Sequence, residues 1–135
     1  MAVGGEPPDT PHVLELNRDV VDIAEIRRWA GSALPGLNED DLLDVQLIVT
    51  ELVSNVYDHG EFPARLRLDA PSGDGSVRIE VEDASSIPPV LKPSSPHSAR
   101  GRGLVLVDQL AGEWGVTEQR AGKTIWAVVP RTGGE

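Results

Sequence analysis

The apolar residues of this chain change their spacing at about Gly60, and that change restricts the fold more than any other feature of the sequence. Over 17–31 and 38–59, hydrophobic residues recur at the spacing of an amphipathic helix, with charged residues between them. Over 64–70 and 76–83, apolar and polar residues alternate, which is typical of strands with one buried face. Two helices followed by two strands predict a fold in which helices cover a sheet.

The remaining segments complete an α+β pattern. They are, in chain order, a short edge strand at 12–16, a Ser- and Pro-rich loop at 84–100, a helix at 101–112, and a closing hairpin with strands at 113–119 and 123–129. We therefore predict a two-layer α+β sandwich, in which a mostly antiparallel mixed sheet is covered on one face by three helices. The folded domain is expected at 12–130, between a Gly- and Pro-rich flexible tail at 1–11 and a short C-terminal tail at 131–135.

Charge and composition argue against several classes of protein. The 135 residues carry a formal net charge of −10, whereas phosphate binding needs clustered Lys and Arg, so no direct nucleic-acid partner is expected. The absence of cysteine excludes a disulfide framework and a thiolate metal site. The sequence contains neither an apolar run long enough for a membrane nor a signal-peptide core. We therefore expect a cytoplasmic, single-domain protein with no membrane partner.

Polar side chains form one edge of the helix predicted at 38–59. Glu51, Asn55 and Asp58 fall within a stripe of roughly 60° at about 100° per residue, and His59 lies at its margin. The stripe is either a solvated helix face or a set of oxygen ligands for a hard cation such as Mg²⁺, bound directly or through water. A carboxylate placed there could also orient a hydroxyl nucleophile.

A single acid ends the second strand on its inner face. Asp83 shares parity with Val77, Ile79 and Val81, so we expect the sheet to bury it with them. A buried ionised carboxylate costs free energy unless donors meet it, and the exocyclic amine of a purine is one such donor. The alternative is that the strand frays at Glu82 and that Asp83 meets water or caps the loop.

Two glycine-containing segments lie near the C-terminus. The sequence GRGL, at 101–104, leads into a helix; its glycines allow close backbone approach, and the free amides of a helix N-terminus suit an anion such as phosphate. A simple hinge into the helix would have the same sequence. The sequence GKT, at 122–124, looks like the end of a Walker motif, but it lacks the preceding glycine spacing and leads into a strand. It therefore predicts no phosphate site.

Together, these segments resemble the Bergerat ATP-binding fold of the GHKL family, which gyrase, heat-shock chaperone ATPases, histidine kinases and the mismatch-repair MutL proteins share. ELVSNVYDHG resembles the family's N-box, in which a Glu precedes an Asn by four residues and a His follows. VEDASSIPPVLKP resembles the variant adenine box of small regulators, through Asp83, Ser85 and Pro89. GRGLVLVDQLAGEWGV resembles the second glycine box with its helix, and GKTIWAVV resembles the last strand, whose Thr lies near adenine.

The resemblance implies a role for each matched position. Asn55 would coordinate Mg²⁺ beside ATP, and Glu51 would orient or deprotonate the attacking hydroxyl. Asp83 would accept the adenine amine, with support from Thr124 through its hydroxyl or a water molecule. The loop at 88–100 would be the ATP lid. The other nucleotide-binding positions that the resemblance implies are Ser85 and Pro89 in the adenine box, and Gly101, Arg102, Gly103 and Leu104 along the phosphates.

Within this family, the chain is most similar to the small anti-sigma-factor serine kinases and their actinobacterial regulatory relatives. The resemblance implies an ATP-binding regulator of transcription that phosphorylates an antagonist protein of the STAS class and sequesters a sigma factor. The alternative is a catalytically weak or inactive nucleotide-binding switch that acts only through protein binding. The four prolines between Pro88 and Pro96 favour this alternative, because they stiffen the lid and remove amide donors. The oligomeric state stays open between monomer and homodimer.

Overall fold

The computed structural model of the chain describes residues 11–19, 22–70, 75–85 and 103–130. The helices and strands are, in order, β1 (His12–Leu16), α1 (Ile23–Ala33), α2 (Glu39–His59), β2 (Ala64–Asp69), β3 (Val77–Asp83), α3 (Gly103–Leu110), β4 (Glu113–Gln119) and β5 (Gly122–Val129). None of the helices in this part of the chain combines the length and apolar character needed to span a membrane.

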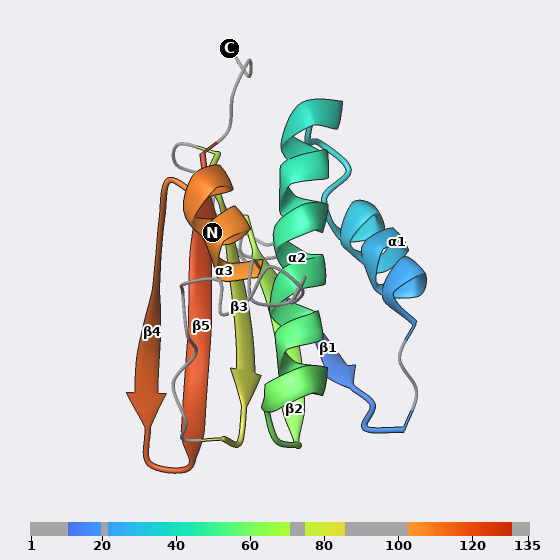
Figure 1. Cartoon of the computed structure of the whole chain (residues 1–135). Helices are drawn as coiled ribbons and strands as arrows, with labels where there is room; N and C mark the ends of the chain where they lie inside the picture. Colours follow the sequence, from blue (N-terminus) through green and yellow to red (C-terminus); the bar gives the residue numbers. More distant parts are fainter. Residues whose placement is uncertain (1–10, 20–21, 71–74, 86–102, 131–135) are drawn as a thin grey trace, which may run out of the picture.

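The strands form a five-stranded sheet in the order β1-β2-β3-β5-β4, in which every described pairing is antiparallel. The helices lie on one side of this sheet, with α1 and α3 on either side of the long α2 (Figure 1). The predicted α+β sandwich and its helical layer are confirmed, although the described strands contain no parallel pair and the sheet is not mixed. Because β5 pairs with β3, the end of β3 lies beside the start of β5, with Asp83 opposite Lys123.

The first helix begins later than the sequence pattern predicts. Apolar spacing extends back to residue 17, whereas α1 begins at Ile23 because the Asp22 side chain caps it, accepting a hydrogen bond from the Glu25 amide at 3.1 Å. The predicted stop at Gly31 is also wrong, since the helix continues to Ala33. Spacing alone detected the helix but not its ends.

The second helix has the predicted ends. The Asn38 side chain accepts a hydrogen bond from the Asp41 amide at 2.8 Å, which satisfies one free donor of the first turn. At the other end, the Gly60 amide donates to the Val56 carbonyl at 2.8 Å. The buried apolar face of α2 consists of Val45, Ile48, Val49, Leu52, Val53 and Val56. This face packs on the sheet, so the opposite edge of α2 is available for polar side chains.

The core lies between α2 and the inner face of the sheet. In β3, the buried residues Val77, Ile79 and Val81 alternate with partly exposed ones. The next strand continues the same layer with Ile125, Ala127 and Val129. Each large aliphatic side chain buried in this way contributes roughly 1.5–3 kcal/mol, so the layer fixes the register of β3 against β5.

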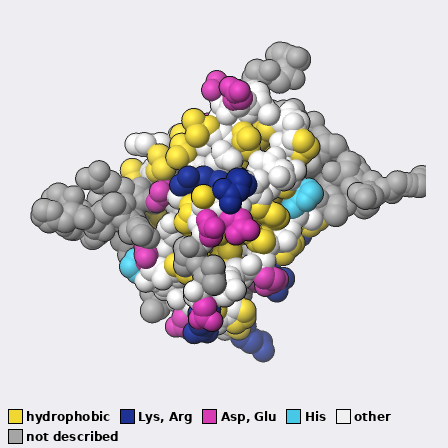
Figure 2. All heavy atoms as spheres, turned by 90° about the vertical axis from the view of Figure 1, so that its right-hand side faces the viewer, with side chains coloured by type: hydrophobic (Ala, Val, Ile, Leu, Met, Phe, Trp, Pro, Cys, Tyr) yellow, Lys and Arg dark blue, Asp and Glu magenta, His cyan; other side chains and the backbone are white. Residues whose placement is uncertain are grey.

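The surface on the α1 side of the molecule is mixed in character (Figure 2). Lys and Arg side chains gather near its centre, with Asp and Glu side chains next to them and apolar side chains scattered between. Among the described residues, the large apolar side chains that are well exposed are Val13, Leu43 and Leu47. Scattered exposure of this kind is ordinary for a soluble surface.

Candidate functional site

Two polar segments predicted from the sequence meet at one end of the molecule. Gly60 ends α2, and the next residue, Glu61, accepts a hydrogen bond through its carbonyl from the Ala84 amide at 2.8 Å. Ala84 directly follows Asp83, the last residue of β3. The end of the helix that carries the Glu51–Asn55 edge is therefore tied to the end of the strand that carries Asp83.

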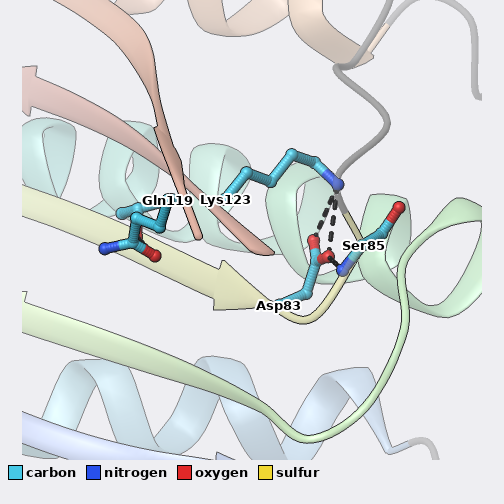
Figure 3. Close-up of polar contacts among 5 residues, drawn as sticks. Asp83, Ser85, Gln119 and Lys123 are labelled. Carbon is cyan, nitrogen blue, oxygen red and sulfur yellow. Dashed lines mark hydrogen bonds and ion pairs between the residues drawn. The ribbon is translucent and has the colours of Figure 1, made fainter. Parts of the chain in front are cut away.

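Asp83 is buried, as its parity predicted, and donors surround it. The residue is 4% exposed. Its Oδ1 atom accepts a hydrogen bond from the Ser85 backbone amide at 2.6 Å. The Lys123 ammonium lies 3.2 Å from Oδ1 and 3.1 Å from Oδ2, so one cation bridges both carboxylate oxygens (Figure 3). The alternative of a frayed strand with Asp83 in water is therefore wrong.

Lys123 is the residue that the sequence analysis missed. Its side chain is 4% exposed, although lysine is among the residues most often found in water. A signal was present, because Lys123 shares parity with Ile125, Ala127 and Val129 and therefore points to the buried face of β5. Parity on neighbouring antiparallel strands thus predicts a buried ion pair with Asp83.

Two glycines make room for the ion pair. A Cβ atom at Gly122, whose φ is +158°, would collide with the carbonyl oxygen of Asp83. A Cβ atom at Gly60 would lie 3.0 Å from the Oδ2 atom of Asp83, which is closer than side chains normally approach. Backbone therefore lies close to Asp83 on two sides: Gly60 faces its carboxylate, and Gly122 faces its main chain.

Thr124 does not lie with Asp83. Residues alternate between the two faces of a strand, and Thr124 is paired with Glu82, so both point away from the helices. There Thr124 lines a small polar hollow with Arg67 and Glu80, and its hydroxyl is 3.4 Å from the side chain of Gln119. Lys123, and not Thr124, occupies the position that faces Asp83, and a role for Thr124 near adenine stays a prediction.

The side chains on the polar edge of α2 become more exposed toward the end of the helix. Glu51 and Asn55 are half-buried, whereas Asp58 and His59 are exposed. The first two residues are separated by about 6 Å along the helix axis, because each residue of a helix rises by about 1.5 Å. Their carboxylate and amide oxygens are of the kind that Mg²⁺ prefers. The described residues contain no group of three His, Cys, Asp or Glu side chains that could hold a metal ion by themselves.

The remaining predicted site residues are only partly described. Gly103 is the first residue of α3, and Leu104 is buried in the hydrophobic core at 5% exposure. Leu104 can therefore contribute its backbone, but its side chain packs in the interior. Pro89, Gly101, Arg102 and the predicted lid at 88–100 lie outside the described residues.

The two ends of an ATP molecule fit this arrangement unequally. At the α2 edge, Glu51 and Asn55 have oxygen donors that a metal could share with phosphate oxygens. At Asp83, which the family resemblance predicts to accept the adenine amine, Lys123 and the Ser85 amide already donate to the carboxylate. The predicted phosphate end has oxygen atoms available for a metal, whereas the predicted base end has donors from the protein itself.

A separate groove of about 320 Å³ lies between β1, α1 and Tyr57. The residues that line it include Leu14, Ile26 and Trp29, with Glu15 and Glu25 among the polar ones. None of the site residues predicted from the sequence lines this groove. It therefore does not belong to the site at Asp83.

Comparison with known proteins places the chain in a family. The model of the histidine kinase-like ATPase domain matches residues 16–129, which span most of the 135 residues. The chain therefore belongs to the histidine kinase-like ATPase domain family. No curated protein gives a significant match to the sequence.

Two solved structures illustrate the likeness in fold. One contains the RsbU and RsbW domains of Rv1364c from Mycobacterium tuberculosis; it is similar to this chain with a TM-score of 0.68 and 20% identity, over 90% of this chain and 32% of that one. The other is the histidine kinase domain from the Erythrobacter litoralis EL346 blue-light activated histidine kinase, with a TM-score of 0.55 and 19% identity, over 83% of this chain and 60% of that one. The chain thus spans about a third of the first structure and three fifths of the second. At identities of 20% and 19%, the similarity shows a shared fold and nothing about function.

Proposed function

We propose that this chain is an ATP-binding regulator of the anti-sigma type, which acts as a protein-serine kinase on a STAS-type antagonist and sequesters a sigma factor. Membership of the histidine kinase-like ATPase domain family supports nucleotide binding. The RsbW domain in the Mycobacterium tuberculosis neighbour supports the choice of an anti-sigma regulator over a sensor kinase. The finer points, serine as acceptor and the two protein partners, rest on the sequence motifs.

One observation carries the proposal: the end of α2, the helix with the polar edge, lies against the end of β3, which carries Asp83. The link is the close approach of Gly60, at the end of α2, to the Asp83 carboxylate. The hydrogen bond between Ala84 and Glu61 holds the same two segments together. A nucleotide needs protein groups at its phosphate end and at its base end, and in this proposal α2 supplies the first and β3 the second.

In this proposal each polar residue has a separate task. Asn55 holds Mg²⁺ together with the phosphates, and Glu51 orients the serine hydroxyl of the antagonist protein. Asp83 reads the base. Bound Mg-ATP supplies the phosphoryl group, and because phosphoryl transfer depends on positioning and charge, the contribution of the protein is largely the placement of these side chains. A carboxylate that positions or deprotonates a nucleophile contributes about 10²–10⁴-fold in rate.

The Asp83–Lys123 pair favours a second candidate, a nucleotide-binding switch without phosphoryl transfer. A base-reading carboxylate that is satisfied within the protein lowers the affinity for the nucleotide. The four prolines in the sequence from Pro88 to Pro96 favour the same candidate, because each proline removes one backbone amide donor. In this second function, the same surface binds the sigma factor or its antagonist, and no phosphate is transferred.

A transfer assay separates the two candidates. The purified chain is incubated with radiolabelled Mg-ATP and STAS-type proteins encoded beside it, and phosphoserine formation is measured. The first candidate predicts transfer that falls by about 10²-fold or more in Glu51→Gln, while ATP affinity changes by less than about threefold. The matched control is Glu118→Gln, an exposed glutamate of β4, which keeps wild-type rates. ATP binding without transfer to any such protein would support the switch, and undiminished transfer in Glu51→Gln would remove Glu51 from its role.

A further inference from the structure

We propose that Lys123 is an internal competitor for the base-reading carboxylate, so that a nucleobase binds only when the lysine ammonium leaves Asp83. This inference rests on the proposed nucleotide-binding function and deepens it. It makes Lys123 a residue that sets affinity and base specificity. Nothing in the sequence motifs gives it this role.

The first argument is that both oxygens of the carboxylate already have a donor. Asp83 Oδ1 accepts from the Ser85 amide and lies 3.2 Å from the Lys123 ammonium, while Oδ2 lies 3.1 Å from the same ammonium. Figure 3 shows the lysine side chain reaching along the sheet to place its nitrogen above both oxygens. An exocyclic amine needs one of these oxygens as acceptor. In this conformation, the ammonium and the amide already use them.

The second argument is that, within the described part of the chain, the two side chains of the pair are almost completely buried. The Asp83 side chain is 2% exposed and that of Lys123 is 4% exposed. Gly60 closes the Oδ2 side, since an added Cβ there would already stand 3.0 Å from that atom. Gly122 packs its backbone against the Asp83 backbone from β5. The Lys123 ammonium is therefore the group that must move before a base reaches Asp83.

The third argument concerns the direction of the energy difference. When a base enters, the Asp83 carboxylate loses the Lys123 ammonium as its partner and gains a neutral amine. In a buried site, separating a paired charge from its partner costs free energy. The hydrogen bond from the base to Asp83 does not offset that cost alone, so the phosphate and metal contacts at the α2 edge must contribute the remaining free energy. The native lysine therefore weakens binding of the whole nucleotide and reduces the preference for bases that carry an exocyclic amine.

The test uses nucleotide affinity in a matched pair of variants. Lys123→Met keeps the length of the side chain and removes the charge. Arg120→Met removes one positive charge from the exposed turn of the same hairpin. Calorimetry with Mg-ATP should show that Lys123→Met binds at least about tenfold more tightly than the wild type, while Arg120→Met stays within about twofold. Only Lys123→Met should gain a preference of about tenfold for ATP over purine riboside triphosphate, which lacks the exocyclic amine.

A second measurement needs no variant and so does not depend on the folding of Lys123→Met. Lys92 and Lys123 are the only lysines of the sequence, so acetylation by an amine reagent can be assigned by mass spectrometry. Without nucleotide, Lys123 should react at least about tenfold more slowly than in the denatured chain, because its ammonium is buried. Saturating Mg-ATP should raise that rate, whereas Mg-tripolyphosphate, which has no base, should leave it unchanged.

The outcomes separate this inference from the function on which it rests. Mg-ATP binding with Lys123 still protected, or a Lys123→Met variant that binds ATP no better than the wild type, would overturn the competition while leaving nucleotide binding intact. Binding by Lys123→Met alone would support the competition and identify the wild type as the switch. Failure of both proteins to bind at millimolar Mg-ATP would overturn the proposed function and this inference together.

Discussion

Replacing Lys123 by methionine removes one buried charge and leaves the side-chain length almost unchanged. Asp83, which is 4% exposed, would then keep the hydrogen bond from the Ser85 amide and lose its cationic partner. Removing one partner of a buried ion pair costs about 3–5 kcal/mol, because an uncompensated charge stays in the interior. A domain of this size is stable by about 5–15 kcal/mol in total, so Lys123→Met should remain folded at low temperature but lose a large share of its free energy of unfolding.

The assay is urea unfolding followed by circular dichroism, with the free energy taken by linear extrapolation. The variant Asp83→Leu/Lys123→Met removes both charges, and its free energy of unfolding should be within about 2 kcal/mol of the wild-type value, because an apolar pair of similar volume often replaces a buried ion pair without loss of stability. The double variant should therefore be more stable than Lys123→Met. Arg120→Met should change stability by less than about 0.5 kcal/mol. A loss below about 1 kcal/mol in Lys123→Met would show that the ammonium is not buried against Asp83 in solution, and the reasoning would fail.

Two further predictions concern neighbouring parts of the fold. Gly122→Ala should lower the free energy of unfolding by about 1–3 kcal/mol, because its Cβ would collide with the Asp83 carbonyl. Gly31→Ala, inside α1 with neighbours no closer than 3.7 Å, should stabilise the protein by about 0.5–1 kcal/mol. Thermal unfolding of both variants checks the contrast. Burial raises the pKa of Tyr57, the single tyrosine, above 10.0, although its hydrogen bond to the Asn17 carbonyl opposes the shift. Because the folded state favours the neutral phenol, this contribution to stability is complete below the ordinary pKa and is lost as the pH rises through the raised value. Absorbance titration should place phenolate formation above the value found in urea, and an identical midpoint would contradict the shift.

The period of the apolar residues was enough to predict the layers of the fold. Alternation in β3 predicted that Asp83 is buried, since Val77, Ile79 and Val81 set the parity of the strand. Local hydrogen bonding decided what periodicity could not: Asp22 caps α1 and moves its start to Ile23. Apolar spacing reports which residues face the core, whereas capping depends on a single side chain.

The site was harder to predict because its parts come from strands distant in sequence. Asp83 and Lys123 are 40 residues apart, and only the pairing of β3 with β5 makes them neighbours. A lysine beside a hairpin turn is usually exposed, so the parity that Lys123 shares with Ile125 is the signal in the sequence for its burial. The same one-residue offset explains Thr124: it follows the facing position and so points to the other side of the sheet.

The buried pair also links stability to activity in this account. Asp83 reads the base in the function proposed above, but an ionised carboxylate in the interior needs a partner in the absence of nucleotide. Lys123 supplies that partner and stabilises the empty protein. Improving nucleotide affinity by removing the lysine should therefore lower the stability of the free protein, an opposition that is common where a functional group is buried.

The measurement that tests the central claim most directly is calorimetric titration of Mg-ATP into the wild-type chain, with Asp83→Asn alongside. The account predicts saturable binding by the wild type that weakens or disappears in Asp83→Asn, because the base is read by the carboxylate at the end of β3. Equal affinity in the two proteins would remove Asp83 from the nucleotide site. No binding to either protein, nor to Lys123→Met, at millimolar Mg-ATP would contradict the claim that this chain is a nucleotide-binding regulator.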